Sequence, residues 1–174
     1  TVQLNELVIT KIQNHALKSA SPSQNGEKMF EIMSIVQNVQ WKQSEVDLRH
    51  ATTLNTIEWI SALVTGQSKL GWNPDIAKEN VRLSENLTAF TSAHANISNY
   101  IKREESVLAS RWWTEDEALA MLSWVWQNLM CLVGAFEGAL QSVEHVASRL
   151  CALASTVSQV IVVAPEDGPV LPVP

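Results

Sequence analysis

Residues 118–163 decide the fold, and they read ALAMLSWVWQNLMCLVGAFEGALQSVEHVASRLCALASTVSQVIVV. Two sets of apolar residues recur through this stretch at heptad spacing, and no polar residue interrupts either set. The first set is Leu122, Leu129, Phe136, Val143, Leu150 and Val157, and the second is Leu119, Trp126, Val133, Leu140, Ala147, Ala154 and Ile161. Repeats of this period predict one long helix, beginning at about residue 115, with a coiled-coil-like packing surface.

The remainder of the chain predicts three more helices from the same kind of periodicity. Apolar residues recur at alternating steps of three and four over residues 28–65 and over residues 74–110, which indicates two further long helices. Residues 3–19 predict a shorter N-terminal helix. Residues 21–26 combine serine, proline, asparagine and glycine, and such a cluster favours a loop between the first two helices.

The predicted helix ends carry recognisable capping residues. Asn73 is a suitable N-cap because it precedes Pro74, which fits the first turn of a helix. Thr114 and Glu117 have the spacing of a capping box, in which each side chain binds the other residue's backbone amide. Gly66 is the expected C′ residue of the helix over residues 28–65, because glycine readily adopts the left-handed conformation that closes a helix.

Together these elements predict an all-α protein. Short connections between long helices favour antiparallel neighbours, so we expect an elongated up-down bundle of three long helices plus the shorter N-terminal helix. We expect residues 1–163 to form a single helical-bundle domain. Residues 164–174 contain four prolines and predict an extended tail of polyproline type.

Composition and motifs argue against several classes of function. The net charge of −6 and the pI near 5.2 disfavour nucleic-acid binding, which relies on clustered Lys and Arg. Glycine-rich phosphate loops, His-Glu-x-x-His, Gly-x-Ser-x-Gly and Cys-x-x-Cys patterns do not occur in the sequence, although active sites assembled in three dimensions need no such motif. We therefore predict a non-enzymatic protein without catalytic residues or cofactors.

The last long helix is more apolar than its neighbours. Apolar residues make up 30 of the 49 positions over residues 115–163, against 18 of 38 over residues 28–65. A helix that is apolar most of the way round has to be buried most of the way round. We therefore predict a second apolar face that contacts another protein copy or lipid. This predicted interface consists of Met121, Val125, Leu132, Ala135, Ala139, Val146, Leu153 and Val160.

Polar residues also fall on the packing stripes of the predicted bundle. They are Gln43, His50, His94, Gln127 and Glu137. In an antiparallel arrangement the two histidines and Glu137 come to a similar height, and the two glutamines share another level. We interpret these residues as a buried polar layer that fixes the register between helices. Two histidines and one glutamate fall short of a usual metal site, so no metal is predicted. After a register layer and a metal site, the third interpretation of these residues is a layer that responds to pH.

Three functions are compatible with these features. The leading hypothesis is a structural subunit of a filament, a virion or a secretion apparatus that forms a homo-oligomer through its last helix, and it favours a secreted or surface-assembled location. The alternative is a membrane-active bundle that forms pores or binds lipid, because residues 118–136 are uncharged over a length that could span a bilayer. A third hypothesis is an adaptor that binds a partner's amphipathic helix.

Overall fold

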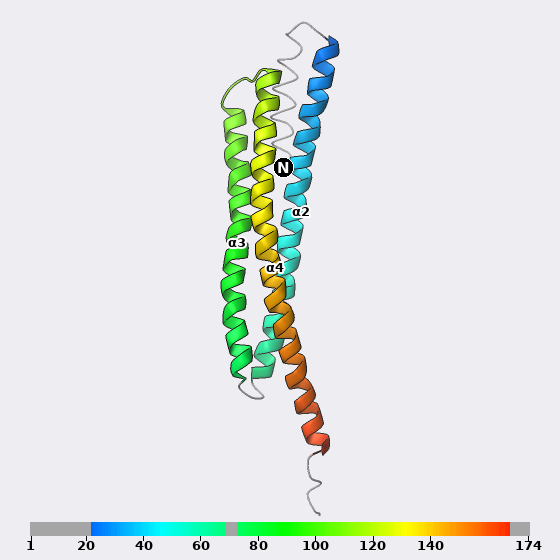
Figure 1. The fold of residues 1–174 in the computed structure, drawn as a ribbon, viewed down its shortest axis with the longest axis vertical. Coiled ribbons are helices and arrows are strands. Elements are labelled where there is room, and N and C mark those ends of the chain that lie inside the picture. The colour runs from blue at the N-terminus through cyan, green and yellow to red at the C-terminus, as the bar shows by residue number, and fades with distance from the viewer. Residues whose placement is uncertain (1–21, 69–72, 168–174) are drawn as a thin grey trace, which may run out of the picture. The chain divides into compact units, whose positions relative to one another are not determined.

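The computed structural model describes residues 22–68 and 73–167 of the chain (Figure 1). These residues form three helices and no strand, namely α2 (Pro22–Ser68), α3 (Pro74–Ala109) and α4 (Glu115–Asp167). The predicted all-α class with three long helices is therefore confirmed. The helix predicted over residues 3–19 and the part of the tail over residues 168–174 lie outside the described residues.

Both predicted helix starts are confirmed by their hydrogen bonds. At the start of α3, the backbone N–H of Asp75 donates to the side-chain oxygen of Asn73 at 2.9 Å. At the start of α4, the backbone N–H of Glu117 donates to the hydroxyl of Thr114 at 3.2 Å. The backbone N–H of Thr114 donates in turn to the Glu117 carboxylate at 3.4 Å. These contacts satisfy amide donors that the first turn of a helix leaves without partners.

Removing the Thr114 cap is expected to destabilise α4. We expect Thr114→Ala to lower the free energy of unfolding by about 1 kcal/mol, because the Glu117 amide loses its acceptor. Urea denaturation followed by circular dichroism measures the change. Thr91→Ala is the matched control, since Thr91 is exposed within α3 and alanine is the better helix former. Equal stabilities for the two variants would contradict the assigned cap.

Three predicted helix boundaries are wrong. Residues 22–26 belong to α2 instead of a loop, which is compatible with the preference of proline for the first helical turn. Gly66 lies inside α2, and no described glycine has a positive φ. A helix interior tolerates glycine at a cost of about 1 kcal/mol. The helix α4 continues to Asp167, so any extended tail begins no earlier than residue 168. Pro165 lies in the last turn of this helix, where a proline removes one backbone hydrogen bond and its ring crowds the carbonyl four residues earlier.

The described helices divide between two compact units. Among the described residues, unit 1 comprises residues 22–50 and 91–137, and unit 2 comprises residues 51–68, 73–90 and 138–167. The single domain expected over residues 1–163 stays a prediction.

The core of unit 1 is built from the inward faces of its three helical segments. Val36 from α2, Ile97 from α3 and Leu129 from α4 are almost fully buried. Phe136 of the first heptad set is fully buried as well. The other buried apolar residues of this unit are Ile32, Val39, Val46, Tyr100, Ile101, Leu108, Trp113, Ala118, Leu122, Val125 and Val133.

Two ion pairs define the register between α2 and α4 in unit 1. Lys28 Nζ lies 2.6 Å from Asp116 Oδ1, and Arg49 lies 3.8 Å from Glu137 Oε1. The residue numbers differ by 88 in both pairs. The helices α2 and α4 therefore run in the same direction and keep the same register between the two pairs. Figure 1 shows α3 running in the opposite direction, as short connections require.

The core of unit 2 uses the same heptad positions of α4. Val143, Leu150 and Ala154 are fully buried, which continues the pattern that predicted this helix. The other buried apolar residues of unit 2 are Ile57, Ile60, Val64, Ile76, Leu83, Phe90, Leu140, Val146 and Ala147.

Candidate functional site

The predicted interface on α4 is only partly exposed. Val125 and Val146 are each 3% exposed, so both are covered by their own units. Ala135 is exposed, and the side chain of Val160 lies outside the described residues. The half-buried members are Met121, Leu132, Ala139 and Leu153. The expectation that these positions form one uncovered face is therefore wrong at the two valines.

Helix geometry explains why the two valines are buried. At about 100° per residue, Val125 lies only about 60° around the helix from the buried Leu122. A side chain this close to the centre of the packed face still contacts the neighbouring helices. The side of α4 opposite Leu122 passes instead through Trp124 and Cys131, and both residues are exposed.

The exposed side of α4 in unit 1 forms a continuous row of residues, which we call the α4 stripe. Its members are Ala120, Trp124, Gln127, Cys131 and Gly134, and all five are exposed. They recur at alternating steps of four and three, which keeps them on one side of the helix. Trp124 is 50% exposed. A Cβ atom built on Gly134 would meet no atom within 4 Å, so packing within the described chain does not require glycine at this position.

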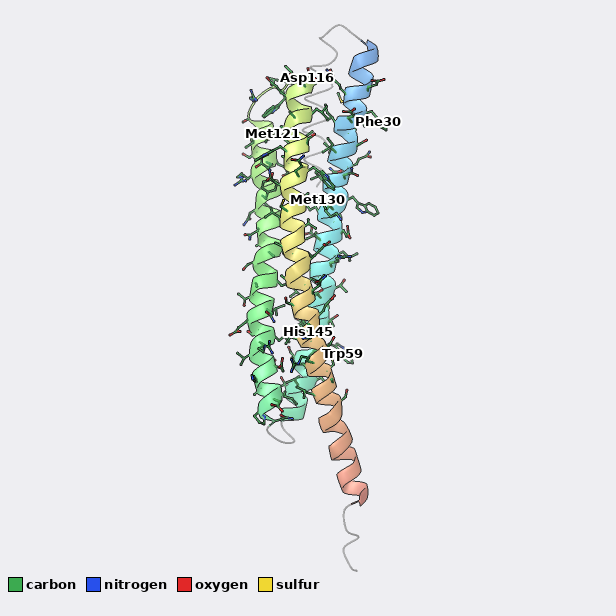
Figure 2. The ribbon with its side chains drawn as sticks, viewed as in Figure 1. Phe30, Trp59, Asp116, Met121, Met130 and His145 are labelled. Carbon is green, nitrogen blue, oxygen red and sulfur yellow. The ribbon has the colours of Figure 1, made fainter. Side chains whose placement is uncertain are left out.

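A second exposed row lies on α2 in unit 1, and we call it the α2 stripe. Its members are Phe30, Ser34, Gln37, Trp41 and Ser44, and all of them are exposed except Ser34, which is half-buried. Phe30 is 72% exposed and Trp41 is 76% exposed, and Figure 2 shows Phe30 projecting from α2 away from α4. Both aromatic side chains therefore contact water and lack the burial that usually stabilises such residues.

Sequence reasoning missed the α2 stripe. The signal was available in the spacing of Phe30, Trp41 and Leu48, since 18 residues span five turns of a helix. Leu48 is also exposed. These residues lie opposite the buried stripe of α2, and a search for one apolar face per helix assigns them to solvent.

The structure brings together only some of the predicted polar layer. The imidazole rings of His50 and His94 stack with their centroids 3.9 Å apart and their planes 4° from parallel. Nε2 of His94 lies 2.8 Å from the Asp47 carboxylate. Glu137 is half-exposed and pairs with Arg49 at 3.8 Å. Among the described residues, no group of three or more His, Cys, Asp or Glu side chains could hold a metal ion.

Gln43 and Gln127, which the sequence places together at another level of the bundle, differ in their burial. Gln127 is exposed and belongs to the α4 stripe, while Gln43 is half-buried on α2. The layer is therefore reduced to His50, His94 and the carboxylate of Asp47. A stacked imidazole pair beside one carboxylate can fix the register of α2 against α3, and it can also respond to protonation.

Protonation of His50 is expected to destabilise unit 1. Burial lowers the pKa of His50 from its usual 6.5, and the neighbouring His94 lowers it further, while Asp47 opposes the shift. The unfolded chain therefore binds a proton at His50 at a higher pH than the folded chain does. As the pH falls below about 6.5 towards the lowered folded pKa, this difference reduces the free energy of unfolding.

We expect His50→Leu to flatten the resulting pH dependence. Urea denaturation at pH values from 7.5 to 5.5 measures the slope, and the variant should be at least as stable as the native chain at the lower end. Replacing His145 with leucine is the control, because His145 is an exposed histidine of unit 2 (Figure 2). An unchanged slope in the His50 variant would leave the pair with a register role alone.

Two buried carboxylates went unnoticed in the sequence. Glu79 of unit 2 is buried and lies 3.3 Å from Arg82 and 3.4 Å from Arg149. Glu104 of unit 1 is buried 3.3 Å from Arg103. Each contact joins a buried carboxylate to a more exposed guanidinium group, which is the usual way of accommodating a buried charge.

One described helix is long and apolar enough to cross a membrane. The window lies within residues Glu115–Ser155 of α4, and 28% of it is buried. Core helices of soluble proteins can meet the same criteria of length and composition. The comparisons with known proteins do not decide between these readings, because no family model, curated protein or solved structure matches the chain.

Proposed function

We propose that this protein is a non-enzymatic assembly subunit whose copies associate through the exposed side of α4. The observation that carries the proposal is the α4 stripe, in which a half-exposed Trp124 stands beside small and uncharged residues. Protein interfaces are enriched in aromatic residues and depleted of charge at their centres. The proposal includes the elongated up-down bundle and the N-terminal helix that the sequence predicts, together with an extended tail that begins after Asp167.

Two features of the α4 stripe are unfavourable in a helix whose surface contacts only water. Gly134 destabilises a helix by about 1 kcal/mol relative to alanine, and no neighbouring atom occupies the space beside it. Exposed Trp124 leaves apolar area in water, at roughly 25 cal/mol per Å². A second protein surface would bury the tryptophan and could approach the helix closely at the glycine. Self-association therefore explains both features together.

The test is the concentration dependence of the molecular mass. Sedimentation analysis from about 1 to 100 μM should show a mass that rises with protein concentration, and Trp124→Ala should weaken this association about 30-fold or more, as loss of a central aromatic anchor usually does. Trp112→Ala is the matched control, because Trp112 is an exposed tryptophan outside the α4 stripe. A monomer over the whole concentration range would refute the proposal.

A membrane-active bundle is the second candidate, and the apolar window of α4 favours it. Such a protein would present the same helix to a bilayer. Flotation with neutral and anionic vesicles at pH 7.4 and 5.5 separates the two functions. Co-flotation of a chain that stays monomeric in solution would support lipid binding. Stable co-purification with a different helical chain would favour an adaptor that binds an amphipathic helix.

A further inference from the structure

We propose that the α4 stripe of one copy is covered by the α2 stripe of the next copy, with the two helices running in the same direction. This inference rests on the proposed self-association and names the surface that takes part in it. In the proposed register, each α2 residue lies beside the α4 residue whose number is larger by 90. Both stripes belong to unit 1, so one compact unit carries both halves of the contact.

Side-chain sizes in the two stripes are complementary at this register. Phe30 falls beside Ala120, and Trp41 falls beside Cys131. The order of sizes reverses where Trp124 falls beside Ser34. The remaining positions pair Gln37 with Gln127 and Ser44 with Gly134. Each large aromatic side chain therefore meets a small residue, and the open space at Gly134 leaves room for the backbones to approach. Such matching is what close helix packing requires.

The two stripes also share their spacing. Both follow steps of four, three, four and three residues, which is the repeat that keeps two parallel helices in contact along a seam. The large side chains Phe30 and Trp41 are 11 residues apart, as are the small residues Ala120 and Cys131. The match in size therefore extends over about three turns of helix and does not depend on one isolated contact.

The register inside unit 1 permits this packing. Within one chain, residues of α2 and α4 at equal height differ in number by 88. The proposed contact requires a difference of 90, which corresponds to an axial shift of about 3 Å at 1.5 Å per residue. A neighbouring copy can therefore lie beside the first in the same orientation with very little displacement along the helices.

Charge and area are compatible with a second copy as the occupant. None of the ten stripe residues is charged, so the contact buries no unpaired charge. The exposed parts of Phe30, Trp41 and Trp124 amount to about 400 Å², taking roughly 200 Å² for each whole aromatic side chain. An equal area on the facing stripe gives about 800 Å², and the intervening residues have to supply the remainder of the roughly 1,000 Å² that a specific interface buries as a minimum.

The proposed contact joins two different surfaces, so it is heterologous. Each copy then has one α2 stripe and one α4 stripe available for its neighbours. Contacts of this kind produce closed rings or open chains, whereas a contact between identical surfaces stops at a two-fold dimer. The inference therefore predicts assemblies larger than dimers from a single type of contact.

Disulfide trapping tests the register directly. The test chain carries Gln37→Cys and Gln127→Cys together with Cys131→Ser and Cys151→Ser, which remove the native thiols and keep all three aromatic residues. Mild oxidation with diamide should join neighbouring copies and produce a ladder of dimers, trimers and larger species on a non-reducing gel. Reduction should return every band to the monomer. Either cysteine alone can produce only dimers.

The register control moves one thiol by one heptad. Gln37→Cys with Ala120→Cys, in the same background, places the two thiols about 10 Å apart along the helices, beyond the reach of a disulfide. This chain should yield at least tenfold less ladder than the first. Equal ladders from the two chains would overturn the proposed register. Self-association of the native chain without any ladder would overturn the α2–α4 pairing and leave the proposed function standing. A chain that remains monomeric would refute both.

Discussion

Replacing Phe136 with alanine is expected to lower the free energy of unfolding by about 3–5 kcal/mol. Phe136 is fully buried in unit 1, and its ring lies 6.4 Å from that of His94. Alanine would leave a cavity beneath the histidine pair, and three packed helices could close this cavity only in part. The loss combines the transfer free energy of the removed ring atoms with the contacts that their neighbours forfeit.

Phe30→Ala is the matched control for this prediction. The same ring is removed, but from an exposed position of the same unit, so the free energy of unfolding should change by about 0.5 kcal/mol or less. Both variants should be unfolded in urea at low protein concentration, where association does not add to stability. Similar losses in the two variants would mean that the burial assigned to Phe136 is wrong.

The parts of the fold that were predictable from the sequence depend on local chemistry. Asn73 and Thr114 cap their helices by contacts that span two or three residues, and such signals need no knowledge of the tertiary fold. The heptad positions Leu122 and Phe136 were predictable because buried positions repeat with the helix. Gly66 failed as a stop signal, since a long, otherwise helical segment can accommodate one glycine.

The exposed surface was harder to predict because it depends on which neighbours each helix has. Counting apolar residues showed that α4 has more than one packing stripe requires, but it did not show which of them other helices cover. Val125 is covered within unit 1, while Cys131 is not. On α2, the exposed Trp41 interrupts a run of polar residues and adds nothing to the buried periodicity. A single apolar residue in such a position is common on protein surfaces.

Filling the small position opposite Trp41 should abolish self-association. Cys131→Trp places a second large ring where the proposed register already seats Trp41 of the neighbouring copy. Two such rings cannot occupy the space beside a cysteine, so the dissociation constant should rise by about 100-fold or more, in the range seen for the strongest interface positions. Cys131 is exposed in the isolated chain, so the free energy of unfolding should change by about 0.5 kcal/mol or less.

Exchanging the two sizes should restore association. Trp41→Ala alone removes an anchor and should weaken association about 30-fold or more. In the double variant Trp41→Ala with Cys131→Trp, the ring supplied by α4 occupies the volume vacated on α2. Its dissociation constant should therefore return to within about tenfold of the native value, which makes the two substitutions strongly non-additive. Sedimentation analysis of the four chains measures this coupling. The contrary result is a double variant in which the losses in free energy of association from the two single variants simply add. That result would show that Trp41 and Cys131 do not contact each other, because residues that share no contact change the free energy of association independently.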